Sequence, residues 1–94
     1  MFVNVAFVDP SPGKENDLVN NMHAFADSLR DQPGILRIHV LKEKEGKTLV
    51  GISMWEDENA FNEAMKKIAS QPANSGKVEA LRPNPPVIRQ FYEI

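Results

Sequence analysis

The chain has 94 residues, the length of a single domain spanning residues 1–94, and with 41% hydrophobic and 26% charged residues it has an ordinary globular composition rather than that of a disordered or coiled-coil protein. Eleven basic residues against thirteen acidic ones give a net charge of −2, so the basic excess typical of nucleic-acid binding is missing. The absence of cysteine excludes disulfides and thiolate sites, and two histidines on different predicted elements make a metal site improbable.

The first half of the chain predicts a strand, a helix and a hairpin. A strand is expected at Phe2–Val8, where β-branched and aromatic residues lead into a turn rich in proline and glycine. A helix is expected over Lys14–Asp31, because apolar residues recur there every three or four positions. Strands at Ile35–Lys42 and Thr48–Trp55, separated by a short polar turn, form the predicted hairpin.

The second half predicts a helix, a loop and a last strand. The helix begins among the acidic residues at Glu56–Asn59 and has two lysines near its end, an order that suits the helix dipole. The proline-rich stretch Gln71–Pro86 predicts a loop, with a short helix around Val78–Leu81. A final strand is expected at Val87–Ile94. Since neither a membrane-spanning segment nor a signal peptide is visible, a soluble, cytoplasmic protein is expected.

The resulting order is βαββαβ, which predicts an α+β fold of the ferredoxin-like kind: one antiparallel sheet with both helices on one face. A domain this small builds only a thin core from one sheet and two helices. Self-association is a common way to add stability, so a homodimer is expected.

Residues alternate between the two faces of a strand, and assigning the more apolar half of each strand to the helices predicts the composition of both faces. The residues then expected to face the helices are Val3, Val5 and Phe7, Leu36, Ile38 and Val40, and Val50, Ile52 and Met54. The residues expected to face away are Phe2, Asn4, Ala6 and Val8, Ile35, Arg37, His39 and Leu41, and Leu49, Gly51, Ser53 and Trp55. The alternation of the last strand is ambiguous. Such a mixed apolar and polar face predicts the wall of a half-buried pocket, shared in a dimer.

Three stretches of the chain resemble the antibiotic biosynthesis monooxygenase family of dimeric α/β barrels. They are Pro12-Gly13-Lys14-Glu15, Gln32-Pro33-Gly34-Ile35 and Trp55-Glu56-Asp57-Glu58-Asn59-Ala60-Phe61. With the βαββαβ order, the resemblance covers roughly residues 1–68. It implies a dimeric α/β barrel and activity as a monooxygenase that uses no metal, flavin or other cofactor. In such an enzyme an electron-rich phenolate or hydroquinone itself passes an electron to O2.

Within this resemblance, six residues are candidates for the site. His39 is the expected base or hydrogen-bond donor and Arg37 the expected partner of a phenolate or carboxylate. Trp55 is expected to stack on the aromatic ring of a small substrate. Asn4 and Ser53, with Phe61, are expected to contact that substrate.

Structural roles for the same residues remain open alternatives. Trp55 also suits a core or interface position, and His39 suits a packed, hydrogen-bonded one. Arg37 can pair with an acid across a dimer, and Asn4 can satisfy a backbone group.

The chain departs from the best-known branches of the family. The polyketide-oxidising branch has an Asn where Gly51 stands and a Tyr where Phe61 stands. The haem-degrading branch has a Trp where Ala64 stands and a later His, whereas no histidine follows His39. Haem degradation is therefore disfavoured and the substrate is left open. A ligand-binding or regulatory dimer without enzymatic activity, and an isomerase or lyase, are the alternative functions.

Overall fold

The structure is a computed structural model of the 94-residue chain and describes residues 1–69 and 78–94. Its elements are β1 (Phe2–Val8), α1 (Glu15–Leu29), β2 (Ile35–Lys42), β3 (Leu49–Trp55), α2 (Glu58–Ala69), the 3-10 helix η2 (Val78–Leu81) and β4 (Val87–Tyr92). The predicted order is confirmed, and the predicted bounds differ by only a few residues at the element ends. The part of the predicted loop at residues 71–77 lies outside the described residues.

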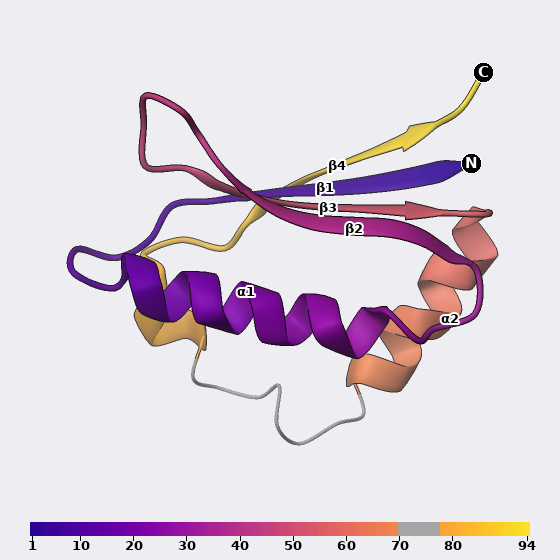
Figure 1. Ribbon diagram of the computed structural model, residues 1–94, viewed down its shortest axis with the longest axis horizontal. Coiled ribbons are helices and arrows are strands. Elements are labelled where there is room, and N and C mark those ends of the chain that lie inside the picture. The colour runs from indigo at the N-terminus through magenta and orange to yellow at the C-terminus, as the bar shows by residue number, and fades with distance from the viewer. Residues whose placement is uncertain (70–77) are drawn as a thin grey trace.

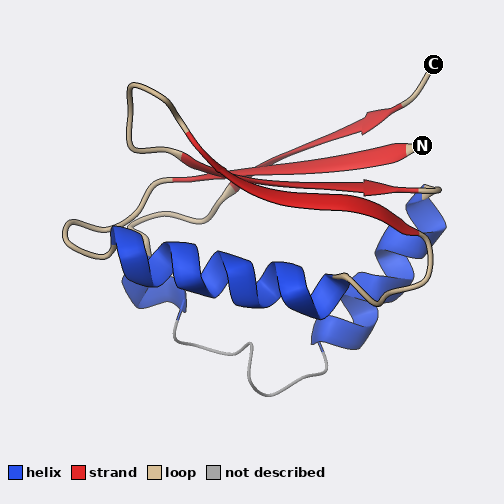
Figure 2. Ribbon diagram, viewed as in Figure 1, coloured by secondary structure: helices blue, strands red, loops and turns tan. Residues whose placement is uncertain are grey.

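The four strands form one antiparallel sheet in the order β2-β3-β1-β4. Both long helices lie on one side of this sheet, with α1 running along it and α2 beneath the end where β3 finishes (Figures 1 and 2). No described helix covers the opposite side. The ferredoxin-like α+β fold expected from the sequence is thus confirmed.

Strand pairing arranges the side chains in rows across the sheet, and the rows alternate between its two faces. The inner face, which meets the helices, has four rows; three run from β2 to β4, and the fourth runs from β2 to β1. They are Ile35, Trp55, Phe2 and Tyr92; Ile38, Ser53, Asn4 and Gln90; Val40, Gly51, Ala6 and Ile88; and Lys42, Leu49 and Val8. The outer face has three rows: Arg37, Met54, Val3 and Phe91; His39, Ile52, Val5 and Arg89; and Leu41, Val50, Phe7 and Val87.

The predicted faces of β1 and β3 were therefore wrong. Phe2, Leu49 and Trp55, which were expected to face away from the helices, are buried against them with at most 1% of their surface exposed. The more apolar half of each central strand lies on the outer face instead. Apolarity alone misassigned the faces because the helix-facing positions in the middle of both strands are small or polar.

The prediction for β2 was right from Arg37 onward. Ile38 is buried against α1, as expected, and Val40 packs against the same cluster. A register shift between Ile35 and Arg37, of the kind that a β-bulge produces, changes the alternation at the start of the strand. As a result Ile35 packs on the core and Leu36 is 49% exposed, the reverse of what was expected.

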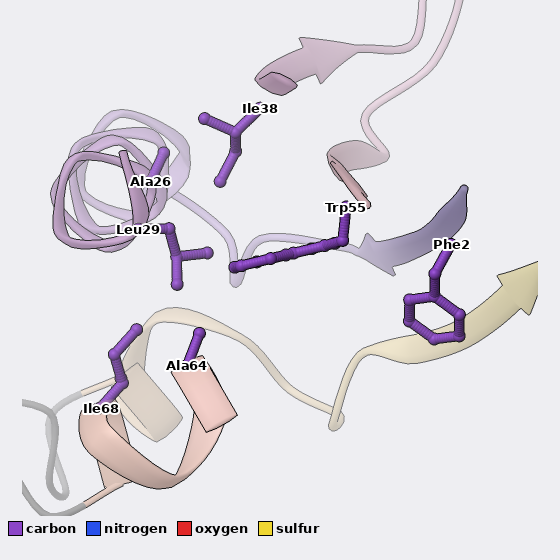
Figure 3. Packing of buried hydrophobic residues seen from close by; sticks show 7 residues of the cluster. All are labelled: Phe2, Ala26, Leu29, Ile38, Trp55, Ala64 and Ile68. Atoms are coloured by element: carbon purple, nitrogen blue, oxygen red, sulfur yellow. The ribbon is translucent and has the colours of Figure 1, made fainter. Parts of the chain in front are cut away.

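The core consists of two separate clusters on the inner face. The larger one joins β1, β2 and β3 to both helices (Figure 3) and contains Phe2, Ala26, Leu29, Ile38, Trp55, Ala64 and Ile68. The smaller one joins the other ends of β1 and β3 to α1 and contains Val8, Leu18 and Leu49. On the inner face, large side chains therefore pack at both ends of the central strands, whereas the positions between them carry small residues.

Candidate ligand-binding cavity

A cavity of about 800 Å³ lies between the middle of the inner face and the helices. Its floor is formed by the small residues Asn4, Ala6, Gly51 and Ser53 of the two central strands. Apolar side chains of α1 and α2, including Met22, Phe25, Phe61 and Met65, line the opposite side. The size and the mainly apolar lining match those of sites for small organic molecules.

Gly51 is the clearest reason why this space exists. A β-carbon at this position would lie 3.6 Å from Cε of Met22, so a methyl group would fit in ordinary contact. A longer side chain would extend into the cavity. The glycine that departs from the family pattern therefore has a physical role here, because it leaves the middle of β3 without bulk.

Two hydrogen-bonded pairs place polar groups on this floor. Gln90 Nε2 of β4 donates to Asn4 Oδ1 of β1 over 3.0 Å. Trp55 Nε1 donates to Ser53 Oγ over 2.9 Å, and Ser53 is only 6% exposed. Within residues 1–69 and 78–94, Asn4 Nδ2 has no hydrogen-bond partner, so this amide group can donate to an oxygen atom of a ligand.

The strand that brings Gln90 to the cavity is attached to α2. Tyr92 donates a hydrogen bond from its hydroxyl to Glu58 Oε1 over 2.6 Å, and its ring lies 5.6 Å from that of Phe2. The hydrogen bond to Glu58, followed by the negative charge of that carboxylate, raises the pKa of Tyr92. These contacts hold β4 against the helix layer next to the position of Gln90.

One cation lies at the cavity and comes from the segment between η2 and β4. Arg82 is half-buried and lines the cavity together with Pro86 and Ile88. The residue before it is fixed twice, since Leu81 packs against the smaller core cluster and its carbonyl oxygen accepts a 2.8 Å hydrogen bond from the Ser11 backbone N–H. The lining formed by the described residues contains neither Asp nor Glu.

The structure brings three of the six predicted site residues together at the cavity. Asn4, Ser53 and Phe61 all line it. Trp55 is next to them and is fully buried, with 0% of its surface exposed. Its ring centroid lies 5.8 Å from that of Phe61, and its indole N–H donates a hydrogen bond to Ser53. The predicted grouping on one face was right for Asn4, Ser53 and Trp55, although that face is the inner one.

Arg37 and His39 lie apart from this group. Both are exposed, and the register places them in outer rows beside Met54 and Ile52. His39 borders the cavity as a residue of β2, but its neighbours Ile38 and Val40 face the helices, so alternation directs its imidazole to the outer face. The expectation that these two side chains share a face with Asn4 and Ser53 was wrong, because the more apolar half of β2 faces the helices, whereas the more apolar halves of β1 and β3 face away from them.

Four polar residues of the lining were not predicted from the sequence: Asn21 and Ser28 of α1, Arg82, and Gln90 of β4. Gln90 stood on the strand with ambiguous alternation, and only its register opposite Asn4 places it on the inner face. Arg82 stood in a proline-rich stretch without periodicity. A polar residue within a strand, as Asn4 is, was the one available signal that a polar partner lay across the sheet.

Comparison with known proteins identifies the family of this chain. The family model for antibiotic biosynthesis monooxygenases matches residues 1–73. The chain belongs to the antibiotic biosynthesis monooxygenase family. The curated proteins contain no match to it.

Solved structures of this fold are similar at low sequence identity. The PA3566 protein of Pseudomonas aeruginosa has a TM-score of 0.83 and 21% identity, with 99% of this chain and 93% of that chain covered. The Rv0793 protein of Mycobacterium tuberculosis has a TM-score of 0.84 and 17% identity, with 99% and 94% covered. MhuD of Mycobacterium tuberculosis, a heme-degrader with two hemes bound in its active site, has a TM-score of 0.78 and 16% identity, with 100% and 96% covered.

Two features are absent from the part of the chain that the structure describes. None of its helices combines the length and the apolar character needed to cross a membrane. Within residues 1–69 and 78–94, no group of three or more His, Asp or Glu side chains is placed to hold a metal ion.

Proposed function

We propose that the protein is a monooxygenase that needs no cofactor and oxidises a small aromatic, phenolic or quinol-type substrate in the inner cavity. The observation that carries the proposal is the cavity itself, about 800 Å³ in volume, with an apolar helix side and amide and hydroxyl groups on its floor. Membership of the antibiotic biosynthesis monooxygenase family supports the choice of oxygen chemistry.

An electron-rich substrate can reduce O2 directly, so the protein needs only to bind the substrate, stabilise its anion and exclude water. An aromatic ketone with an acidic methylene group loses a proton, and the anion passes one electron to O2. The two radicals combine in a C–O bond, and the resulting peroxide anion takes up a proton to give a hydroperoxide. Loss of the second proton from that carbon, with cleavage of the O–O bond, leaves a ketone and one water molecule. Asn4 and Ser53 would hold the substrate oxygens, and the apolar walls would exclude water.

Haem is not the substrate that we propose. Ala64 occupies the position of the haem-degrading branch's Trp and is buried in the larger core cluster, with 2% exposed. No histidine follows His39 in the sequence. A phenolic molecule without a metal fits the donors and apolar side chains of the cavity better.

Oxygen consumption with a panel of hydroquinones and anthrone-like phenols tests the proposal. The Gly51→Leu variant should lose at least tenfold in rate, because the new side chain enters the cavity. Asn20→Leu, at an exposed position of α1, adds the same bulk outside and should keep wild-type activity. Circular dichroism verifies that both variants are folded. No oxygen uptake with any substrate, or full activity of folded Gly51→Leu, would contradict the proposal.

A catalytic role for His39 and Arg37 remains a prediction with its own test. Because both side chains belong to outer rows, we expect His39→Ala and Arg37→Ala to change oxygen uptake by less than the cavity variant does. If either variant lost as much oxygen uptake as Gly51→Leu, the substituted residue would have a role in the reaction.

A ligand-binding protein without turnover is the second candidate. One observation favours it: apart from His39, whose imidazole faces outward, no described lining residue offers an imidazole or a carboxylate that could act as a base. Binding of an aromatic ligand would then raise the melting temperature by mass action while no oxygen is consumed. Product analysis under the same conditions distinguishes this outcome from isomerase or lyase activity.

We further propose that the protein is a homodimer formed through the outer face. The central strands contribute only apolar side chains to this face, namely Val3, Val5, Phe7, Val50, Ile52 and Met54. Arg37, His39 and Arg89 lie on the edge strands. An apolar centre with a polar rim is the usual composition of an interface, and a sheet face of this kind is rarely left in water. A second copy provides a matching surface through a two-fold axis.

The oligomeric state tests this interface directly. Ile52→Lys places a charge at the centre of the outer face and should convert the dimer to a monomer in sedimentation experiments. Asn20→Lys adds the same charge on α1 and should leave the dimer intact. A wild-type protein that sediments as a monomer at all concentrations would overturn this part of the proposal.

A further inference from the structure

We infer that the cavity selects anionic aromatic molecules, those with a phenolate, an enolate or a carboxylate, and that Arg82 is the residue that recognises the negative charge. This inference rests on the proposed cavity function and specifies the class of substrate. It begins with charge. In a chain of net charge −2, the described lining of the cavity holds one arginine and neither Asp nor Glu.

Among the side chains that the structure describes, none forms an ion pair with the guanidinium of Arg82. The ion pairs formed between these side chains involve Arg30, Lys42, Lys66 and the N-terminus, and none of them reaches the cavity. Arg82 also donates no hydrogen bond to a described residue. A half-buried arginine without a carboxylate partner gains most from an anion that enters the cavity, because guanidinium–oxyanion hydrogen bonds are the strong, charge-assisted kind.

The backbone next to Arg82 is held in place through its neighbour Leu81. The hydrogen bond from Ser11 to the carbonyl oxygen of Leu81 and the packing of Leu81 on the smaller core cluster hold the preceding residue. Arg82 is therefore presented from one end of the cavity, while the amides of Asn4 and Gln90 lie on its floor. An aromatic anion can place its charged oxygen at Arg82 and a second oxygen at Asn4 Nδ2.

The position of Arg82 also explains how the substrate can ionise without a basic side chain in the cavity. A cation beside the substrate lowers the pKa of a phenol or of an acidic methylene group, because it stabilises the charged form. Apart from His39, whose imidazole is directed to the outer face by the alternation of β2, the described lining offers no imidazole or carboxylate that would take the proton within the cavity. Selecting a substrate that is already anionic, or that ionises readily beside Arg82, removes the need for such a group.

A pair of ligands of equal shape and unequal charge provides the test. Binding of naphthoate and of naphthamide is measured by calorimetry to the wild-type protein, without turnover. We expect naphthoate to bind about tenfold to a hundredfold more tightly, the range for a hydrogen bond to a charged group. Arg82→Gln should abolish this preference and Arg82→Lys should keep part of it. Arg30→Gln, which removes the same charge from an exposed end of α1, should keep all of it.

A second measurement follows the proton directly. The colour of para-nitrophenol reports its ionisation, so its pKa can be measured when it is bound. The wild-type protein should lower this pKa relative to water, and Arg82→Gln should lower it less. A merely structural role for Arg82 would not produce this difference.

The outcomes separate the two proposals. Equal binding of both ligands by the wild type, or an undiminished preference in Arg82→Gln, would overturn the role of Arg82 while the aromatic cavity stands. Failure of both ligands to bind the wild-type protein would overturn the cavity proposal and this inference together.

Discussion

The contact between Trp55 and Ser53 gives a quantitative test of how the wall of the cavity is built. Trp55→Phe removes the 2.9 Å hydrogen bond to Ser53 Oγ, which is worth about 1 kcal/mol net. The smaller ring leaves a void of a few tens of Å³ in the larger core cluster, and at about 24 cal/mol per Å³ this costs about 1 kcal/mol more. The free energy of unfolding should therefore fall by about 2 kcal/mol.

Thermal unfolding followed by circular dichroism measures this loss, since the variant has no tryptophan left for fluorescence. For a domain of this size, about 2 kcal/mol corresponds to a decrease of roughly 8–16 °C in the melting temperature. Protein concentration must be equal in all samples, because association would shift the transition.

A double-mutant cycle isolates the hydrogen bond from the loss of volume. Trp55→Phe combined with Ser53→Ala should show a coupling energy of about 1 kcal/mol. The control combines Trp55→Phe with Leu18→Val in the smaller core cluster, where the effects should add within roughly 0.5 kcal/mol. Additive effects in the Trp55–Ser53 pair would refute the reasoning, because the hydrogen bond would then contribute nothing measurable.

Three further predictions concern single features of the fold. Gly34 has φ +85°, and a β-carbon there would lie 2.5 Å from the β-carbon of Ala60 in α2, so Gly34→Ala should lower the free energy of unfolding in urea by about 2–4 kcal/mol. Gly13 has φ +76° but open space around it, so Gly13→Ala should lower this free energy by only about 1 kcal/mol. Because Glu58 raises the pKa of Tyr92, the only tyrosine, tyrosinate absorbance should develop above the ordinary value near ~10, and Glu58→Gln should lower that pKa. The stability that this pair contributes is complete below the unfolded-state pKa and is lost as pH rises through the higher folded-state pKa. Trp55 should resist quenching by acrylamide, since none of its surface is exposed.

Much of the site was visible in the sequence as residue types but not as a geometry. Asn4, Ser53, Trp55 and Phe61 were recognised, and the structure groups them around one cavity. Asn4, Ser53 and Trp55 were predicted on the wrong side of the sheet, because the more apolar half of each strand was expected to pack on the helices. This expectation fails where the helix side of the sheet borders a cavity.

The sequence by itself determined the order and approximate bounds of the elements, because hydrophobic periodicity and the glycine and proline signals act locally. It also determined that each central strand has two different faces. Only the tertiary structure decided which face meets the helices, because alternation is the same in either orientation and large side chains at the strand ends, such as Phe2 and Leu49, make the packing contacts. The register across the sheet then placed Gln90 beside Asn4, a pairing of residues 86 positions apart that no local pattern specifies.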